Sequence, residues 1–513
     1  MHWAYPKGAG PDVSGMKVTI MGLGLNGGGL ESARYLALRG ADCTVTDLKN
    51  EQDLAPSIEK LEALTVARPF RYVLGRHDMD DFKNADLVIK NPGVPSGSPY
   101  LAAARRVETD ISLFLAASPA RLIAVTGSKG KSSTASALCR VLAGMREKSL
   151  LRGKAFLGGN ITVSPLSFLD ELSGDDDVVL ELSSWQLGDL RSRLRSEYDG
   201  GAPAGEALLK PRAAVLTSIM ADHQDRYDGM EPYVNDKRVV YQGQNKEDAT
   251  IASADDPWGR SFLRESPGRP LAYSEHPAGT GPADSPTDGP TGWIDPRTGA
   301  GMVRLADGSV GEAVPAVLQV PGRHLKKNLL AAALALADLG IPLSHIRESL
   351  GTFPGIEHRL EFFREIRGIR FYNDTAATIP EAAAAAVEAF TGGETTGNGP
   401  AGPLILVTGG QDKNLDFSPL VTAAARARDI VLLAGTGSDK LIPRLTAAGL
   451  PYHGPCTAIG DAAAAALEAA RGYMGAGRAV VVLSPGCASF GMFKNEFDRG
   501  RQWKEAVRNL PEG

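Results

Sequence analysis

The sequence predicts an α/β protein of three domains, each built around a largely parallel sheet. Short apolar runs alternate with amphipathic stretches from Met16 onward, which is typical of strands alternating with helices. Two of the predicted strand-to-helix turns are rich in glycine. The chain has 513 residues, and a single hydrophobic core stops growing at ~250–300 residues. We therefore expect several α/β domains.

An apolar strand over residues 17–21 opens the first domain and runs into a glycine-rich turn. An amphipathic helix follows to about Arg39, and a second strand ends at Asp47. This βαβ unit predicts a Rossmann-like domain, which we place at residues 16–118 because a proline closes the last helical stretch. Residues 1–15 contain Pro, Gly and charges but no apolar run, and we expect them to be flexible.

A strand over residues 122–126 opens the second domain and passes through another glycine-rich turn into a helix. Apolar strands follow at residues 178–182 and 213–218, at spacings that fit a parallel sheet. Residues 266–292 are rich in Pro, Gly, Ser, Thr and Asp, so we expect a surface insertion there. We place this P-loop ATPase-like domain at residues 119–353.

The third domain, at residues 354–513, alternates strands and helices in the same way. Strands are predicted at residues 370–372, 404–408, 430–434 and 479–484. The alternation indicates a second Rossmann-like domain at the C-terminal end.

The composition argues against several classes of function. A formal net charge of -5 gives no basic field for a phosphate backbone, so we expect no nucleic-acid partner. No stretch approaches the ~18 apolar residues that span a bilayer, so we expect no membrane partner. The four cysteines are far apart and form no CxxC pair, which favours a reduced cytoplasmic protein without structural zinc.

The turn after the first strand contains Gly22, Gly24 and Gly27, and Asp47 ends the next strand. In dinucleotide-binding domains, such glycines let a pyrophosphate approach the backbone at a helix N-terminus. We therefore expect a nucleotide or nucleotide-sugar site, and an NAD-dependent oxidoreductase is one interpretation. Alternatively, the glycines serve only the packing of helix against sheet.

The turn after residues 122–126 has the composition of a phosphate-binding loop. Its backbone N–H groups would cradle phosphate oxygens of ATP, while Lys131 neutralises the outer phosphates and Ser132 reaches Mg²⁺. Val125 stands where the general pattern has its first glycine, so a solvated turn is the alternative. The loop residues are Gly127, Ser128, Lys129, Gly130, Lys131, Ser132 and Ser133.

Glu181 lies at the end of a predicted strand, and Asp222, His223 and Lys237 follow it along the chain. A carboxylate at a strand end beside a phosphate loop suits Mg²⁺, which takes one or two protein carboxylates and keeps several waters. Alternatively, Glu181 pairs with a cation and His223 caps a turn.

Polar residues accompany the strands of the third domain, at the edge where α/β sheets bind ligands. Asn, Asp and Ser also close turns, so turn chemistry alone is the alternative. The polar sets are His358 with Arg359, residues 373–378, residues 409–413 and residues 484–489.

Taken in order, these segments resemble the Mur ligase family from about Met16 to Leu510. The resemblance is interrupted mainly by residues 266–292. It implies an ADP-forming ligase that uses ATP and Mg²⁺ to join an amino acid to a UDP-linked precursor. The most specific pieces are residues 126–132, 181–187, 222–227, 358–359, 373–375 and 483–495.

The resemblance also implies roles for individual residues. Those near the UDP-linked precursor are Leu25, Asn26, Asp47, Lys49 and Asn160. Besides the phosphate loop, the residues implied to contact adenine, phosphate and ribose of ATP are Asn328, Arg359 and Asp374. Those near the incoming amino acid are Thr378, Lys413 and Ser489. The implied metal ligands are Ser132, Glu181 and His223, with Lys237 if CO₂ carbamylates it. The implied catalytic residues are Lys131, Glu181, His223, Lys237 and Arg359.

The implied substrates are glutamate, expected to be the D-isomer, and UDP-N-acetylmuramoyl-L-alanine. Their joining through an acyl phosphate would serve peptidoglycan precursor synthesis in the bacterial cytoplasm, and we expect a monomer.

Three positions depart from the pattern of glutamate-adding members. Ala376 replaces a lysine, Leu325 replaces an asparagine, and Glu496 stands where an aromatic residue is expected near the amino acid. These differences leave open a related ligase that adds L-glutamate or another amino acid. An NAD-dependent oxidoreductase is the less favoured alternative, because it leaves Lys131 and Asp374 unexplained.

Overall fold

The computed structural model describes residues 12–25, 27–148, 150–161, 163–194, 208–222, 226–277, 291–392, 402–473 and 478–512. Two predicted site residues, Asn26 and His223, lie outside these ranges. The chain forms two compact units. The first unit comprises Met1–Trp293, Val303–Gly311 and Asn328–Ile346, and the second comprises Ile294–Met302, Glu312–Lys327 and Arg347–Gly513.

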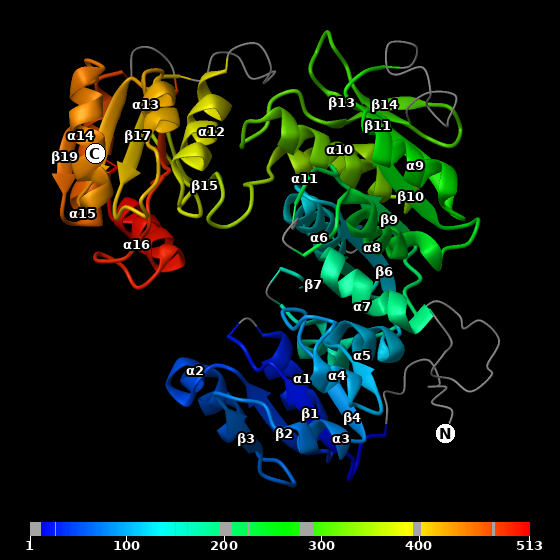
Figure 1. The fold of residues 1–513 in the computed structure, drawn as a ribbon. Coiled ribbons are helices and arrows are strands. Elements are labelled where there is room, and N and C mark those ends of the chain that lie inside the picture. Colours follow the sequence, from blue (N-terminus) through cyan, green and yellow to red (C-terminus); the bar gives the residue numbers. More distant parts are fainter. Residues whose placement is uncertain are drawn as a thin grey trace. The chain divides into compact units, whose positions relative to one another are not determined.

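The first sheet is parallel and has the strand order β3-β2-β1-β4-β5 (Figure 1). Its strands are β1 (Lys17–Met21), β2 (Asp42–Asp47), β3 (Arg71–Leu74), β4 (Leu87–Lys90) and β5 (Val107–Glu108). Its helices are α1 (Gly28–Leu38), α2 (Glu51–Glu62), α3 (Met79–Lys83), α4 (Pro99–Ala102) and α5 (Asp110–Ala117). The strand order reverses between β1 and β4, so the loops after these two strands border the crevice where such sheets bind ligands.

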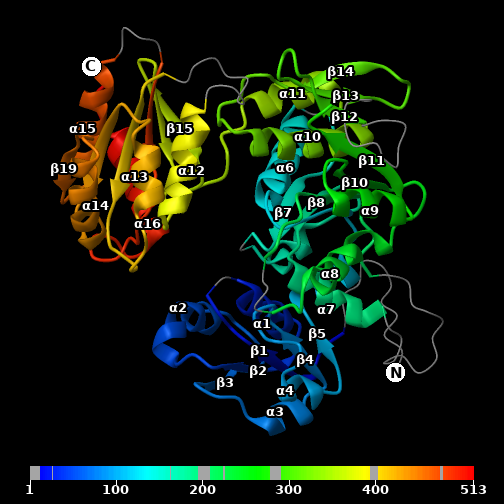
Figure 2. The same ribbon diagram turned by 45° about the horizontal axis from the view of Figure 1, so that its top comes forward.

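The second sheet has the order β14-β13-β12-β11-β10-β9-β6-β8-β7 (Figure 2). Its strands are β6 (Arg121–Thr126), β7 (Ala155–Gly159), β8 (Asp177–Glu181), β9 (Ala213–Leu216), β10 (Ala249–Ser253), β11 (Arg269–Ser274), β12 (Gly292–Ile294), β13 (Gly301–Arg304) and β14 (Val310–Val314). Its helices are α6 (Lys131–Glu147), α7 (Ser184–Leu194), α8 (Met230–Gln242), α9 (Pro257–Glu265), α10 (Arg323–Asp338) and α11 (Leu343–Gly351). Strand β6 is parallel to both neighbours, β8 and β9, so their carboxyl ends meet at one edge.

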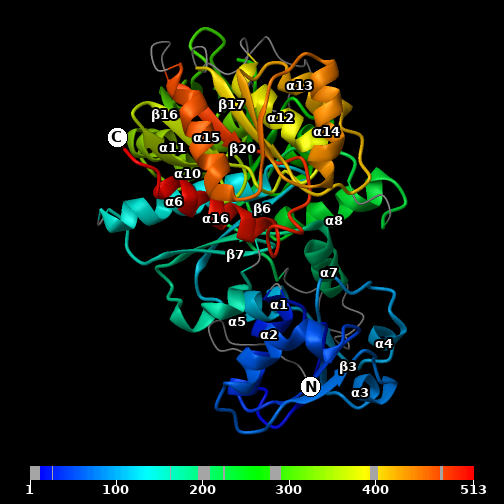
Figure 3. The ribbon, with the colours of Figure 1, turned by 90° about the vertical axis from the view of Figure 1, so that its left-hand side faces the viewer.

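The third sheet has the order β15-β16-β20-β17-β18-β19, and only its edge strand β15 is antiparallel among the pairs described. Its central strands β16, β20 and β17 are labelled in Figure 3. Its strands are β15 (Glu361–Ile366), β16 (Ile369–Asn373), β17 (Leu404–Gly409), β18 (Asp429–Leu433), β19 (His453–Cys456) and β20 (Ala479–Leu483). Its helices are α12 (Pro380–Thr391), α13 (Ser418–Ala424), α14 (Thr436–Ala447), α15 (Ile459–Arg471) and α16 (Glu496–Arg508). The carboxyl ends of β16, β20 and β17 carry three of the polar sets predicted from the sequence, and the fourth, His358 with Arg359, precedes β15.

Helices cover both faces of the third sheet, which explains its continuous apolar strands. Leu404 and Leu406 of β17 belong to the core on one face, and Ile405 and Val407 belong to the core on the other. Because alternate side chains point to opposite faces, every residue of such a strand must be apolar. The sheet is thereby rigid enough to carry polar loops at its edge.

The predicted fold class is confirmed, since three largely parallel sheets alternate with helices along the chain. The domain boundaries at residues 118 and 353 stay predictions. Part of the expected insertion at 266–292 is regular structure instead, because Arg269–Ser274 forms β11 with buried Ala272 and Tyr273. Among the described residues, no helix is long and apolar enough to span a membrane.

Candidate active site

The glycine-rich turn after β1 holds the start of α1 close to the strand. Gly22, Gly24 and Gly27 all have positive φ angles, of 93°, 60° and 95°. A Cβ on Gly29 would lie 2.1 Å from the Gly22 carbonyl oxygen, so only glycine permits this approach of helix to strand. The N-terminus of α1 is therefore held at the carboxyl end of β1, at the edge where such sheets bind ligands.

Asp47 ties the two loops at this crevice together. Its Oδ2 accepts a hydrogen bond from the Gly24 N–H at 3.1 Å, and its Oδ1 accepts one from the Lys49 N–H at 2.9 Å. The side chains of Leu25 and Lys49 are exposed beside it. The loops that carry Leu25, Asp47 and Lys49 are thus joined, and the role of these residues in binding uridine diphosphate stays a prediction.

The phosphate loop joins β6 to α6, whose N-terminal residue is Lys131. Gly130 caps this helix in the left-handed region, with φ 93°. Lys131 Nζ donates to the Gly127 and Ser128 carbonyl oxygens, both at 3.0 Å, and so folds back over the loop. A Cβ on Gly130 would lie 2.3 Å from Asn328 Oδ1, which places Asn328 directly against the loop. Ser132 and Ser133 occupy the first turn of α6, where backbone N–H groups lack helical partners.

Lys237, from α8, is buried beneath the same loop. Its Nζ donates to the Gly127 carbonyl oxygen at 2.9 Å and lies 4.5 Å from the centre of the Tyr233 ring. Burial, reinforced by the charge of Lys131, lowers the pKa of Lys237 to about 7. A large fraction of this amine is therefore neutral, and nucleophilic, at neutral pH.

Glu181 ends β8 beside the phosphate loop and is almost completely buried. Its Oε1 accepts a hydrogen bond from Asn160 Nδ2 at 2.9 Å. Its Oε2 has no hydrogen-bond partner among the described residues. A buried carboxylate oxygen without a partner is costly unless a cation binds it. Together with the Ser132 hydroxyl at the start of α6, this oxygen fits the oxygen ligands of Mg²⁺.

In the second unit, backbone hydrogen bonds join the three polar loops. The Gly409 N–H donates to the Pro485 carbonyl oxygen at 2.8 Å, and the Gly486 N–H donates to the Ala377 carbonyl oxygen at 2.8 Å. Gln411 pairs with Ala488 in both directions, at 3.1 and 2.9 Å. These bonds place the loops that carry Thr378, Lys413 and Ser489 next to one another.

Asp374 lies at the centre of these loops with its carboxylate buried. Ser484 Oγ donates to its Oδ2 at 2.6 Å, and the Leu360 N–H donates to its Oδ1 at 3.1 Å. Burial raises the pKa of Asp374 to about 7 despite these bonds. Arg359, which directly precedes Leu360, is exposed. Its guanidinium forms no ion pair with any residue that the structure describes.

Glu496 stands where the family pattern has an aromatic residue, and Phe497 follows it at the start of α16. Glu496 uses its backbone oxygen to accept a hydrogen bond from Thr375 Oγ1 at 2.9 Å. The ring of Phe497 packs against His358, with 5.4 Å between ring centres.

Arg499 is a buried residue that the sequence analysis did not identify. Its guanidinium donates to Thr375 Oγ1 at 2.9 Å, to the Thr375 carbonyl oxygen at 3.0 Å and to the Cys487 carbonyl oxygen at 3.1 Å. Burial lowers the pKa of Arg499 to about 10. It joins two of the three polar loops, and its one signal in the sequence is a charge on the buried side of α16.

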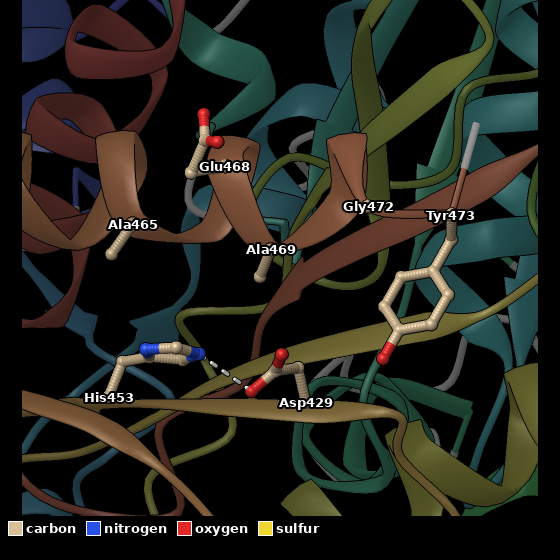
Figure 4. Close-up of a pocket in the computed structure, with 7 residues that line it drawn as sticks. All are labelled: Asp429, His453, Ala465, Glu468, Ala469, Gly472 and Tyr473. Atoms are coloured by element: carbon tan, nitrogen blue, oxygen red, sulfur yellow. Dashed lines mark ion pairs between the residues drawn. The ribbon is translucent and has the colours of Figure 1, made fainter.

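Two further features of the second unit lie outside these loops. Glu357, His358 and Glu361 are close enough to hold a metal ion, but Lys504 Nζ already lies 3.2 Å from Glu357 Oε1 and 2.5 Å from Glu361 Oε1. A hollow of about 500 Å³ opens at the amino ends of β18 and β19, at the sheet edge opposite the polar loops (Figure 4). There, His453 Nε2 lies 2.9 Å from Asp429 Oδ1. Neither feature adds to the candidate site.

Comparison with solved structures supports the fold. UDP-N-acetylmuramate-alanine ligase MurC from Thermotoga maritima matches with a TM-score of 0.52 at 18% identity, over 96% of this chain and 99% of that one. MurF from Acinetobacter baumannii matches with a TM-score of 0.53 at 14% identity, over 96% of this chain and 94% of that one.

Comparison of sequences is more specific. The UDP-N-acetylmuramoylalanine–D-glutamate ligase of Treponema pallidum is 40% identical over 97% of this chain and 98% of that protein. The enzyme of the same name from Roseiflexus is 37% identical over 97% of this chain and 99% of that protein. Family models match along the chain: the Mur ligase MurD-like N-terminal domain at residues 16–112, the Mur ligase middle domain at 125–336, and the Mur ligase glutamate ligase domain at 358–486. The chain therefore belongs to the Mur ligase family.

Proposed function

We propose that this protein is an ATP-dependent ligase that joins D-glutamate to the alanyl carboxylate of UDP-N-acetylmuramoyl-L-alanine. The observation that carries the proposal is the placement of the Lys131 loop and Glu181 at the carboxyl ends of the neighbouring strands β6 and β8. A cationic phosphate loop beside a carboxylate with an unpartnered oxygen is the arrangement that binds a nucleotide with its metal ion. The names of the relatives support the choice of substrates.

In this proposal the first unit binds ATP and the UDP-linked precursor. The N–H groups at the start of α6 and the Lys131 ammonium bind the phosphates, and Asn328 lies beside the loop for the adenine. Glu181, Ser132 and His223 would hold Mg²⁺, which supplies charge neutralisation to the phosphates when bound. The crevice with Leu25, Asn26, Asp47 and Lys49 would bind the uridine diphosphate, with Asn160 nearer the sugar-peptide part.

The second unit binds the incoming amino acid at the joined polar loops. Thr378, Lys413 and Ser489 supply two hydroxyls and an ammonium that suit the carboxylates of glutamate. Arg359 and Asp374 are proposed to contact the phosphate and the ribose of ATP. The buried charge of Arg499 adds positive potential beneath the loops, which favours a dianionic amino acid.

In this proposal the reaction has two steps, phosphorylation of the alanyl carboxylate and attack by the amine of glutamate. The alanyl carboxylate attacks the γ-phosphorus of ATP, so that an acyl phosphate forms and ADP leaves. The amine of glutamate then attacks the acyl carbon, phosphate leaves, an amide forms and the amine releases a proton. Lys131 and Arg359 would stabilise the charge on the transferring phosphoryl group. We place the protein in peptidoglycan precursor synthesis in the cytoplasm, as a monomer.

We further propose that CO₂ carbamylates Lys237. The neutral amine needed for this reaction is favoured by the lowered pKa, and the product would be an anion beside the cation site. Incubation with ¹³C-bicarbonate should give a carbamate signal in the ¹³C NMR spectrum that is absent in Lys237→Ala. A spectrum without that signal at neutral pH would contradict carbamylation and leave the ligase activity as a separate question.

Addition of L-glutamate is the second candidate, because Ala376 removes a cation and Glu496 adds a carboxylate near the amino acid. Purified protein with ATP, Mg²⁺, the UDP-linked precursor and glutamate should yield the amide product by mass spectrometry. Glu181→Gln should reduce its formation by about 10²-fold or more, since the metal ligand is lost. Product formed without ATP would contradict the proposal.

A further inference from the structure

Arg359 lies in a turn whose backbone needs support from its surroundings. The residues on either side of it, His358 and Leu360, both have positive φ angles, of 70° and 44°, although neither is glycine. Side chains with a Cβ rarely adopt this region, and they remain in it only where neighbouring groups hold the backbone. The groups that hold this turn therefore determine the position and direction of the Arg359 side chain.

Hydrogen bonds from three directions hold the turn. The Leu360 N–H donates to Asp374 Oδ1 at 3.1 Å, and the His358 carbonyl oxygen accepts from the Ala376 N–H at 3.0 Å. The His358 N–H donates to Glu361 Oε2 at 3.1 Å. Two of these partners are side-chain carboxylates. Ser484 Oγ holds that of Asp374 by a hydrogen bond, and the carboxylate of Glu361 needs an anchor of its own.

Lys504, from α16, is that anchor. Its Nζ lies 2.5 Å from Glu361 Oε1, and both side chains are about seven-eighths buried, with 14% and 12% exposed. The other oxygen, Oε2, accepts from the His358 N–H and from Asn373 Nδ2, the latter at 3.1 Å. Asn373 Nδ2 also lies 2.9 Å from His358 Nδ1. One carboxylate thus connects an ammonium, the His358 backbone and the Asn373 amide.

The same face of α16 contacts the His358 ring. Phe497, Gly500 and Lys504 are spaced by three and four residues, so they lie on one side of the helix. The Phe497 ring packs on His358, and a Cβ on Gly500 would lie 2.4 Å from His358 Nδ1. The helix is therefore fitted closely to this turn along three of its residues.

We infer that Lys504 and Glu361 are positioning residues for Arg359, which hold the strained turn so that its guanidinium meets the transferring phosphoryl group. This inference rests on the proposed function, in which Arg359 contacts phosphate. Lys504 acts through Glu361 and the His358 backbone, and it touches neither substrate. The lysine also fills the place that a metal ion could take among Glu357, His358 and Glu361.

The kinetic test uses Lys504→Met in the full chain, with Arg370→Met as a matched control. Arg370, on β16, pairs with Glu365 of the neighbouring strand β15 at 3.2 Å, away from the turn. Lys504→Met should lower kcat by about 10–100-fold, because a misplaced group costs this much in rate. KM for ATP and for the UDP-linked precursor should change less than about threefold, and Arg370→Met should keep the wild-type kcat. Lys504→Arg should recover most of the lost activity. A wild-type kcat in Lys504→Met would overturn the inference.

A double-mutant cycle separates positioning from general stability. In the Arg359→Ala background, Lys504→Met should cause almost no further loss of kcat, because both changes remove the same interaction. If the two losses multiply instead, Lys504 does not act through Arg359. Lys504→Gln, which keeps most of the stem, takes the place of Lys504→Met if the latter does not fold.

Hydrogen–deuterium exchange tests the same inference without activity. The peptide that spans the His358 and Leu360 amides should exchange about tenfold faster in Lys504→Met than in wild type, since a charge-assisted hydrogen bond is lost. Unchanged exchange would overturn the inference even in an active enzyme. An inactive wild-type protein would contradict the proposed function alone, and exchange would still decide the role of Lys504.

Discussion

Lys237 and Asp374 are buried ionisable groups. Burial lowers the pKa of Lys237 to about 7 and raises the pKa of Asp374 to about 7. Burial disfavours the charged form of each, so it lowers the pKa of the lysine and raises that of the aspartate. Each group lies at a loop that we assign to ATP. Groups with such strongly shifted pKa values concentrate at functional sites, and both of these were predicted from the sequence.

Asp374→Asn should change the pH dependence of stability. The folded-state pKa is raised, so the stability that protonated Asp374 contributes is present at low pH and is lost as pH rises through about 7. At about pH 8, the variant should therefore unfold at a higher temperature than wild type, and this advantage should narrow toward about pH 5. Thermal unfolding of both proteins between about pH 5 and pH 8 checks this prediction. A difference in unfolding temperature that stays the same at every pH would argue against a raised pKa of Asp374.

Polar residues at the ends of predicted strands were easier to predict than residues whose contacts join loops distant in sequence. Lys131, Glu181 and Asp374 follow strand ends, where polar side chains stand out. Arg499 gave no such signal, because its partners are backbone carbonyl oxygens of loops distant in sequence. The contact of Phe497 with His358 also required the structure, since the side that each residue faces depends on where α16 begins.

At the scale of elements, the connection from β6 to α6 depends on two glycines, Gly127 and Gly130, where a Cβ would lie 1.9 Å from Thr217 Oγ1 and 2.3 Å from Asn328 Oδ1. Gly130 has a left-handed backbone, and any Cβ there would meet the Asn328 side chain. The loop can therefore keep its shape for phosphate binding only with glycine at this position.

Gly130→Ala should weaken ATP binding by about tenfold or more, because a clash with Asn328 and an unfavourable φ both distort the loop. Gly144→Ala on the same helix is the control, since a Cβ there has open space and the helix should gain up to about 1 kcal/mol. Calorimetric titration with ATP measures the first effect, and thermal unfolding measures the second. Equal ATP affinities in the two variants would contradict this role of Gly130.

The regular elements of the fold were largely predictable from apolar patterning. The strand expected at residues 17–21 is β1, and that expected at 404–408 is most of β17. Strand β15 was not predicted, because three of its six residues are charged and it shows neither a continuous apolar run nor a regular alternation. Helix α10 begins at Arg323, five residues before the apolar run that starts at Asn328. Its first turn is mostly polar, so apolar patterning alone does not mark where the helix begins.

At the scale of the whole molecule, a buried ion pair joins the first sheet to the second within the first unit. Lys90 Nζ, at the end of β4, lies 2.6 Å from Asp189 Oδ2 on α7. The side chains are 5% and 12% exposed, so neither charge could be left alone without a large cost.

Lys90→Met should therefore lower the free energy of unfolding by about 3–5 kcal/mol, because it removes the ammonium that offsets the buried charge of Asp189. The double variant Lys90→Met with Asp189→Leu should recover most of this loss, since an apolar pair replaces an ionic one. Urea unfolding of the three proteins measures both effects. A full loss that persists in the double variant would show that the pair matters for more than charge compensation.

The most direct test of the proposed function is phosphate release from ATP by the purified protein, with Mg²⁺ and UDP-N-acetylmuramoyl-L-alanine. D-glutamate and L-glutamate are supplied in parallel, and Lys131→Ala serves as the control. We predict release with D-glutamate only, dependent on the UDP-linked precursor and abolished in Lys131→Ala. Release with L-glutamate alone, or with neither isomer, would contradict the assignment of D-glutamate as the substrate.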